Sequence, residues 1–162
     1  MDTMAAIRRL AADQRALIAA HTYQPPEIQD AADIVGDSYA LAKRAADSDA
    51  RAVYMCGVRF MAEGVKILAP GKRVVLVEPQ ADCPMARQID PQRVAAFRAA
   101  HPEYAVVAYI NTTAELKAVS DVCVTSSSAL KIVRALPQKD ILFIPDKNLG
   151  DYVRRQVPEK HI

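Results

Sequence analysis

Two short polar segments follow apolar runs and carry side chains suited to proton transfer and anion binding. His21 and Tyr23 end the first run, and Tyr109 and Asn111 end a later one. An imidazole titrates near neutral pH, and tyrosine and asparagine side chains donate hydrogen bonds. These residues are therefore candidates for binding a polar ligand. For His21, a structural role in the fold is the alternative.

Serines form a second candidate group. Ser38 lies in Gly36-Asp37-Ser38 and Ser126 in the run 125–128, and each segment precedes a predicted helix. A hydroxyl beside free backbone N–H groups can hold a carboxylate or phosphate, although plain helix capping is the alternative for each. The pair suggests a ligand with two anionic ends.

The three cysteines differ in their surroundings. Cys83 lies in a polar loop before a short helix, where a thiolate is favoured, although an uninvolved loop cysteine is the alternative. Cys56 and Cys123 lie in apolar runs and are expected to be buried small hydrophobes. An odd number of cysteines in a reducing compartment makes disulfides poor candidates.

Apolar runs rich in β-branched residues alternate with amphipathic stretches, which predicts an α/β fold with a mostly parallel sheet. The expected strands are Ala16–His21, Ala52–Gly57, Arg73–Val77, Ala105–Ile110, Asp121–Thr125 and Ile141–Pro145. The expected helices are Pro26–Ile34, Tyr39–Ala46, Phe60–Leu68, Pro91–Ala100, Ala114–Ser120, Ala129–Leu136 and Leu149–Gln156.

The chain also repeats itself without gaps at a shift of 88 residues, which places His21 on Tyr109 and Ser38 on Ser126. Chance similarity of two βα segments is the alternative. A duplication would put both polar segments at the carboxyl ends of parallel strands, where such sheets bind ligands. The shift also sets Lys72-Arg73 on Lys160-His161, so the chain is expected to stop at the start of a strand.

Composition narrows the function classes. The 162 residues are 51% hydrophobic and 25% charged, with a net charge of +2 and no basic run. These values favour a small-molecule partner over nucleic acid or a membrane surface. The first 21 residues contain charges throughout, which predicts a cytoplasmic protein without a signal peptide or membrane span. No G-x-G-x-x-G or P-loop pattern occurs, so a dinucleotide or P-loop site is not indicated.

Beyond these patterns, the chain resembles the quinolinate synthase family. The blocks that carry the resemblance are HTYQPPEIQDAADIVGDS from His21, CGVRFMAE from Cys56, DCP from Asp82, VAYINT from Val107, SDVCVTSS from Ser120 and PDKNLG from Pro145. They occur in the family's order over nearly the whole chain.

The resemblance implies an iron–sulfur enzyme that condenses iminoaspartate with dihydroxyacetone phosphate to quinolinate in NAD biosynthesis, with L-aspartate oxidase as a supplier of iminoaspartate. The family fold is three similar αβα domains, each giving one cysteine to a 4Fe-4S cluster. Here residues 1–88, with an amino-terminal helix, would form the first domain and residues 89–162 an incomplete second. The third is expected to be absent.

Carried over position by position, the resemblance implies that Cys83 is a cluster ligand and that Tyr23 acts in proton transfer. It also implies a substrate-binding set of His21, Ser38, Tyr109, Asn111 and Ser126. Two further cysteines and a substrate-binding His and Glu of the family have no counterpart, so the isolated chain is expected to be inactive.

Three hypotheses remain open at this point. The first is a quinolinate synthase represented by a partial chain. The second is a non-catalytic fragment that acts only with a missing partner half, and sequencing downstream of Ile162 would distinguish the two. A generic phosphosugar-binding α/β domain is the third, and it predicts no dependence on Cys83.

Overall fold

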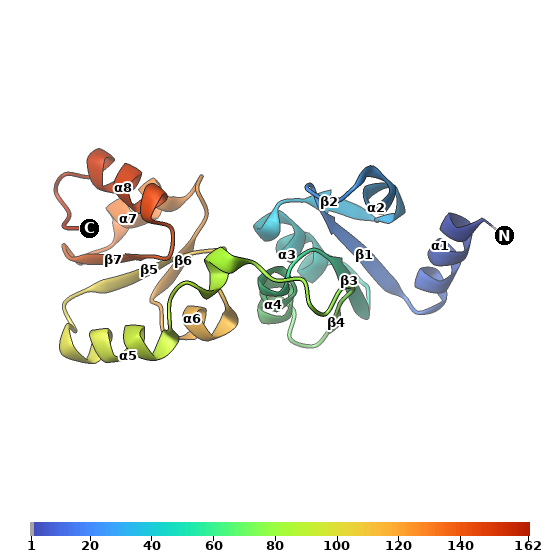
Figure 1. The fold of residues 1–162 in the computed structure, drawn as a ribbon, viewed down its shortest axis with the longest axis horizontal. Coiled ribbons are helices and arrows are strands. Elements are labelled where there is room, and N and C mark those ends of the chain that lie inside the picture. The colour runs from blue at the N-terminus through green and yellow to red at the C-terminus, as the bar shows by residue number, and fades with distance from the viewer. Residues whose placement is uncertain (1) are drawn as a thin grey trace. The chain divides into compact units, whose positions relative to one another are not determined.

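The computed structural model describes residues 2–162, and these divide into two compact units between Cys83 and Pro84. Each unit is a parallel sheet with helices packed on it (Figure 1). The expected α/β class with repeated αβα layers is confirmed. The domain boundary expected between residues 88 and 89 stays a prediction.

Unit 1 contains four parallel strands in the order β2-β1-β3-β4. Its elements are α1 (Thr3–Asp13), β1 (Ala16–His21), α2 (Pro26–Ala31), β2 (Ile34–Gly36), α3 (Ser38–Asp47), β3 (Ala52–Cys56), α4 (Arg59–Leu68) and β4 (Arg73–Leu76).

The two faces of the unit 1 sheet are covered differently. On one face, α3 and α4 bury Leu41, Phe60 and Val65 against the strands, and this face holds most of the core. On the other face, neither α1 nor α2 contains a fully buried residue. An apolar groove of about 330 Å³ remains there, lined by residues of α1, α2 and the sheet that include Ile18 and Ile28.

Unit 2 contains three parallel strands in the order β6-β5-β7. Its elements are a 3₁₀ turn (Pro84–Arg87), α5 (Pro91–Ala100), β5 (Ala105–Tyr109), α6 (Ala114–Ala118), β6 (Val122–Val124), α7 (Ala129–Ala135), β7 (Ile141–Ile144) and α8 (Lys147–Gln156). Helices α7 and α8 lie on one side of this sheet, and α5 and α6 on the other (Figure 1).

Both faces of the unit 2 sheet are buried. Alternate residues of β5 serve the two cores: Val107 packs with the α7 and α8 side, and Val106 packs with Val94 of α5 and Leu116 of α6. A central strand of a parallel sheet is apolar on both faces for this reason. Unit 2 is thus a closed three-layer αβα structure.

Strand register confirms the duplication expected from the sequence. In unit 1, Ala19 pairs with Ile34; in unit 2, Val107 pairs with Val122, the same pair shifted by 88 residues. The shift also relates the bridge from Asp140 to His161 to the first pair of β3 and β4. The ungapped match of hydrogen-bonded partners favours duplication over chance similarity of two βα segments.

One expected element is wrong in its extent. The helix predicted over Pro26–Ile34 ends at Ala31, and Ile34 instead begins the three-residue strand β2. The chain turns because Asp33 donates its backbone N–H to the Ile18 carbonyl (2.9 Å) and accepts the Ile18 N–H on its carboxylate (2.7 Å). These bonds replace helical ones and start a strand beside β1.

Candidate functional site at the carboxyl ends of the strands

His21 is the last residue of β1, and its side chain is buried at 7% exposure. Its Nδ1 accepts the backbone N–H of Tyr23 at 3.2 Å. A neutral imidazole that accepts at Nδ1 carries its proton on Nε2. His21 therefore has an Nε2–H that can donate to an anion or a carbonyl.

Burial lowers the pKa of His21, and the negative charge of Asp37 opposes this effect in part. The net direction keeps the imidazole neutral at pH 7. Asp37 itself caps α3, where its carboxylate accepts the Ala40 N–H at 2.8 Å. Local structure thus makes His21 a neutral hydrogen-bond donor.

Tyr23 lies beside His21 but on the surface. Its ring centroid is 4.6 Å from that of His21, with the planes at 64°, and the residue is 90% exposed. Because the phenol is open to solvent, it is free of packing constraints from unit 1.

Ser38 is the first residue of α3 and is half-buried. The segment Gly36-Asp37-Ser38 does cap the helix, but the capping residue is Asp37 and not Ser38. Within residues 2–162, the Ser38 hydroxyl has no hydrogen-bond partner, so it is available to a ligand. Since His21 pairs with Gly36 of β2, Ser38 follows a strand end adjacent to His21.

In unit 2 the matching positions carry other polar groups. Tyr109 is the last residue of β5 and pairs with Val124 of β6, and both Tyr109 and Asn111 are half-buried. Next to them Thr112 is fully buried, and its hydroxyl has no hydrogen-bond partner among the described residues. This loop therefore presents several polar groups at the strand end.

Ser126 lies in the turn before α7, two residues after the end of β6. The hydroxyls of Thr125 and Ser127 bond to one another at 2.9 Å, and Ser128 accepts the Thr125 N–H at 2.9 Å. Ser126 is exposed and takes no part in this network. The turn is thus stabilised by its other hydroxyls, and capping by Ser126 is excluded because the N-cap is Ser128.

The structure brings His21, Tyr23 and Ser38 to one sheet edge in unit 1, and Tyr109, Asn111 and Ser126 to the matching edge in unit 2. Carboxyl ends of parallel strands are where open α/β sheets bind ligands.

All three cysteines are free thiols of intermediate exposure, so Cys56 and Cys123 are less buried than expected. Cys56 ends β3 and lines the apolar groove, and Cys123 lies on the short strand β6, packed against the core of unit 2. Burial still raises the pKa of both, and for Cys123 the Lys117 charge opposes the rise. Their thiols are therefore poor thiolate ligands.

Cys83 ends unit 1 just before the 3₁₀ turn, where its N–H donates to the Asp82 carboxylate at 2.9 Å. Among residues 2–162, no group of three or more His, Cys, Asp or Glu side chains is arranged to hold a metal ion. An iron–sulfur cluster with three protein thiolates therefore does not fit the ligands of this chain alone.

Sequence reasoning missed several residues that shape these loops. Gln29 and Lys117, at matching positions of α2 and α6, donate to backbone carbonyls of the loops after β1 and β5. The repeat relates the two positions, but the residues differ in type. No identity in the sequence signals their common contact.

The fold and these strand-end groups define a class: a duplicated parallel α/β protein that presents hydrogen-bond donors and hydroxyls for a small polar ligand. Comparison with known proteins defines the family. The chain belongs to the family described as NadA, Quinolinate synthetase A protein, whose profile matches residues 5–162.

Individual relatives agree. The chain is 51% identical over 156 residues to "Quinolinate synthase" of Alkaliphilus metalliredigens, covering 96% of this chain and 52% of that protein. It is also 51% identical to the Aquifex aeolicus protein of the same name over 154 residues, 95% of this chain and 48% of the relative. The chain thus spans about half the length of the curated relatives it matches. Across residues 2–162, the structure contains no helix long and apolar enough to cross a membrane.

Proposed function

We propose that this chain forms the amino-terminal half of a quinolinate synthase, which condenses iminoaspartate with dihydroxyacetone phosphate in NAD biosynthesis. The family assignment and the polar groups at matching strand ends support this proposal. The observation that carries it is the state of His21: buried, neutral and with Nε2–H available.

His21 and Ser38 in unit 1, with Tyr109, Asn111 and Ser126 in unit 2, are proposed to bind the carboxylates and imine of the substrates. A neutral N–H or O–H group donates a charge-assisted hydrogen bond to a carboxylate, because the acceptor is ionised. Tyr23, in ring contact with His21, is proposed for proton transfer. The chemistry thus divides between donors that hold the substrate and one exposed phenol.

Cys83 is the proposed ligand of a 4Fe-4S cluster, and the remaining ligands would come from outside this chain. A cluster iron without a protein ligand supplies Lewis-acid chemistry. Two observations support Cys83 as the ligand. Its thiol is free of any disulfide, and the residue lies in a polar loop outside the strands. L-aspartate oxidase is proposed as the supplier of iminoaspartate.

The test extends this chain to the full length of its relatives and reconstitutes it anaerobically with iron and sulfide. We expect quinolinate formation and a stoichiometric cluster that is lost in Cys83→Ser. Cys56→Ser and Cys123→Ser are matched controls and should retain the cluster. The unextended chain should form no stoichiometric cluster. Retention of the cluster in Cys83→Ser would contradict the ligand assignment.

A second prediction concerns the serine turn. In the extended protein, Ser126→Ala should raise the dissociation constant for a dicarboxylate analogue of iminoaspartate about tenfold to a hundredfold, since a hydrogen bond to a charged group contributes about 1.5 to 3 kcal/mol. Ser127→Ala is the control, because its hydroxyl already bonds to Thr125. Equal effects, measured by isothermal titration calorimetry, would remove Ser126 from the site.

A further inference from the structure

The side-chain amide of Gln29 in α2 bridges the loop that follows β1. Its Nε2 donates to the carbonyl of Thr22 at 3.1 Å and to that of Gln24 at 2.8 Å. A primary amide has two N–H donors, and here both are used on the carbonyls at either side of Tyr23. Because both partners are acceptors, only the nitrogen end of the amide can face them.

Unit 2 contains the same contact made by a different residue. Lys117 of α6, which matches Gln29 in the repeat, donates its Nζ to the carbonyl of Thr112, which matches Gln24. An amide in one copy and an ammonium in the other thus bind the same backbone carbonyl. What the two copies share at this position is a donor at the end of a long side chain.

Each of these contacts lies next to the candidate site groups. In unit 1, the loop directs the Tyr23 N–H onto His21 Nδ1 and the Gln24 N–H onto the His21 carbonyl at 2.9 Å. In unit 2, the Thr112 N–H donates to the Ile110 carbonyl at 2.8 Å, so Asn111 is the central residue of a tight turn. The loop conformation therefore sets the tautomer of His21 and the direction of Asn111.

We propose that Gln29 and Lys117 are positioning residues that hold the two strand-end loops. Gln29 keeps the His21 proton on Nε2, and Lys117 holds the turn that carries Asn111. The identity of the ligand that these loops bind rests on the proposed function. The effect of Gln29 and Lys117 on loop conformation does not depend on it.

The unit 1 test follows the imidazole ¹⁵N resonances of His21 in the 162-residue chain at pH 7.5. We expect the wild type to show the Nε2–H tautomer alone. Gln29→Met, which has similar size but no donor, should shift the two resonances toward a mixture of tautomers. Gln29→Lys, which introduces the donor of the other copy, should restore the wild-type pattern. Asp30→Asn, an exposed neighbour on α2, is the control and should leave the pattern unchanged.

In unit 2 the corresponding measurement is hydrogen exchange of the Thr112 amide. Lys117→Met should accelerate exchange about tenfold, and Lys117→Gln should stay within about threefold of the wild type. Unchanged resonances in Gln29→Met, or equal exchange in both Lys117 variants, would overturn the proposal for that unit.

Activity of the extended protein separates this inference from the proposed function. Gln29→Met should lower kcat/KM for quinolinate formation about tenfold to a hundredfold, since small misplacements cost catalysis heavily, and Gln29→Lys should recover most of it. If the extended wild type makes no quinolinate while the resonances respond as expected, the proposed function fails and the positioning role stands. Full activity in Gln29→Met would overturn the role of Gln29 in catalysis.

Discussion

The two units follow one plan but close their second helical layer differently. Ile28 in α2 is 38% exposed, whereas Leu116, its match in α6, is fully buried. Val94 of α5 is buried against the sheet, while its match on α1 is Ala6, and α1 buries no residue. The two copies therefore share their strand register but differ in how closely the helices of this layer cover the sheet.

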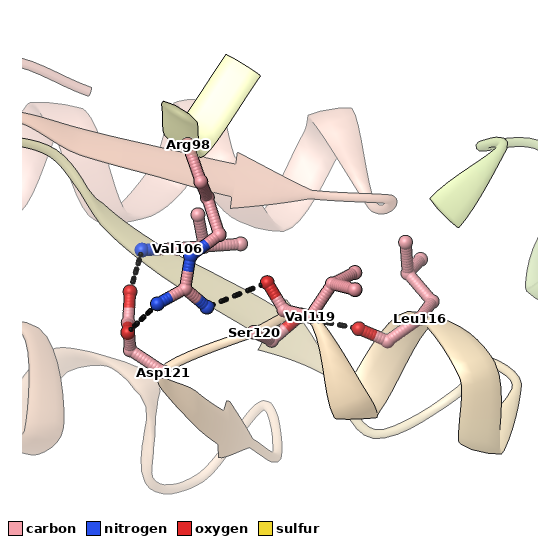
Figure 2. Close-up of polar contacts among 6 residues, drawn as sticks. All are labelled: Arg98, Val106, Leu116, Val119, Ser120 and Asp121. Atoms are coloured by element: carbon pink, nitrogen blue, oxygen red, sulfur yellow. Dashed lines mark hydrogen bonds and ion pairs between the residues drawn. The ribbon is translucent and has the colours of Figure 1, made fainter. Parts of the chain in front are cut away.

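An ion pair marks the same difference. Asp33 and Asp121 each accept the N–H of a central-strand residue, at 2.7 Å in both units. In unit 2 an arginine joins this contact: Arg98 of α5 contacts the Asp121 carboxylate at 2.6 Å and the Val119 carbonyl at 2.7 Å (Figure 2). The match of Arg98 is Leu10, which is 53% exposed. In unit 2, Arg98 thus links helix α5 to the segment that leads into strand β6.

The largest effects should come from the two aspartates. Asp121→Ala should cost about 3 kcal/mol of unfolding free energy and Asp33→Ala about 2 kcal/mol, because each leaves a strand N–H without its charged acceptor and only Asp121 also loses an arginine. Urea unfolding, with exchange of the Val106 and Ile18 amides to localise each effect, measures this.

The asparagine variants sharpen that prediction. An asparagine oxygen can still accept the strand N–H, so Asp33→Asn should recover most of the loss, whereas Asp121→Asn also turns an amide toward Arg98 and should recover less. Equal recovery in both units would show that Arg98 adds nothing to the second copy.

The layered α/β plan and the repeat were predictable because apolar periodicity and an ungapped shift are properties of the sequence. Strand β2 was missed because three residues are too few for a period, although its match at 122–124 was predicted. The positions of His21, Ser38 and Ser126 at strand or helix ends followed from the pattern. The common role of Gln29 and Lys117 did not, because their chemistry differs while their contact is the same.

The openness of unit 1 was also beyond the sequence. The amphipathic pattern of α1 predicts which of its sides faces the sheet, but not how close the helix lies. Ile7 and Leu10 of α1 line the groove together with Ile28 of α2, and none of the three is fully buried. The groove therefore depends on how closely α1 and α2 approach the sheet, which the residue pattern does not determine.

Placing the residue of one unit at the matching position of the other, as Arg98→Leu or Leu10→Arg, should have a moderate effect on the free energy of unfolding. Arg98→Leu should cost about 1 kcal/mol, since the pair with Asp121 is more than one-third exposed on the arginine side and solvent weakens it. The loss should shrink in 1 M salt, which screens the pair. Leu10→Arg should change stability by less than about 0.5 kcal/mol, because α1 is not packed as α5 is. Urea titrations at low and high salt measure both variants, and a large gain from Leu10→Arg would mean that α1 closes on the sheet in solution.

The smallest effect concerns pH and separates the strand ends of the two units. Burial lowers the pKa of His21 in the folded protein, so the unfolded chain, with a histidine pKa of about 6.5, binds the proton more readily. The contribution of His21 to the free energy of unfolding should therefore be complete above that pH and fall as the pH drops toward the lower folded pKa.

Protonation also removes the acceptor at Nδ1 for the Tyr23 N–H. Unit 2 has Tyr109 at the matching position and therefore no imidazole there. Urea unfolding between pH 7.5 and 5 should show a downward slope that His21→Gln reduces, with amide exchange rising in β1 before β5. An identical slope in His21→Gln would assign the pH dependence to other groups and would contradict a buried, neutral imidazole at His21.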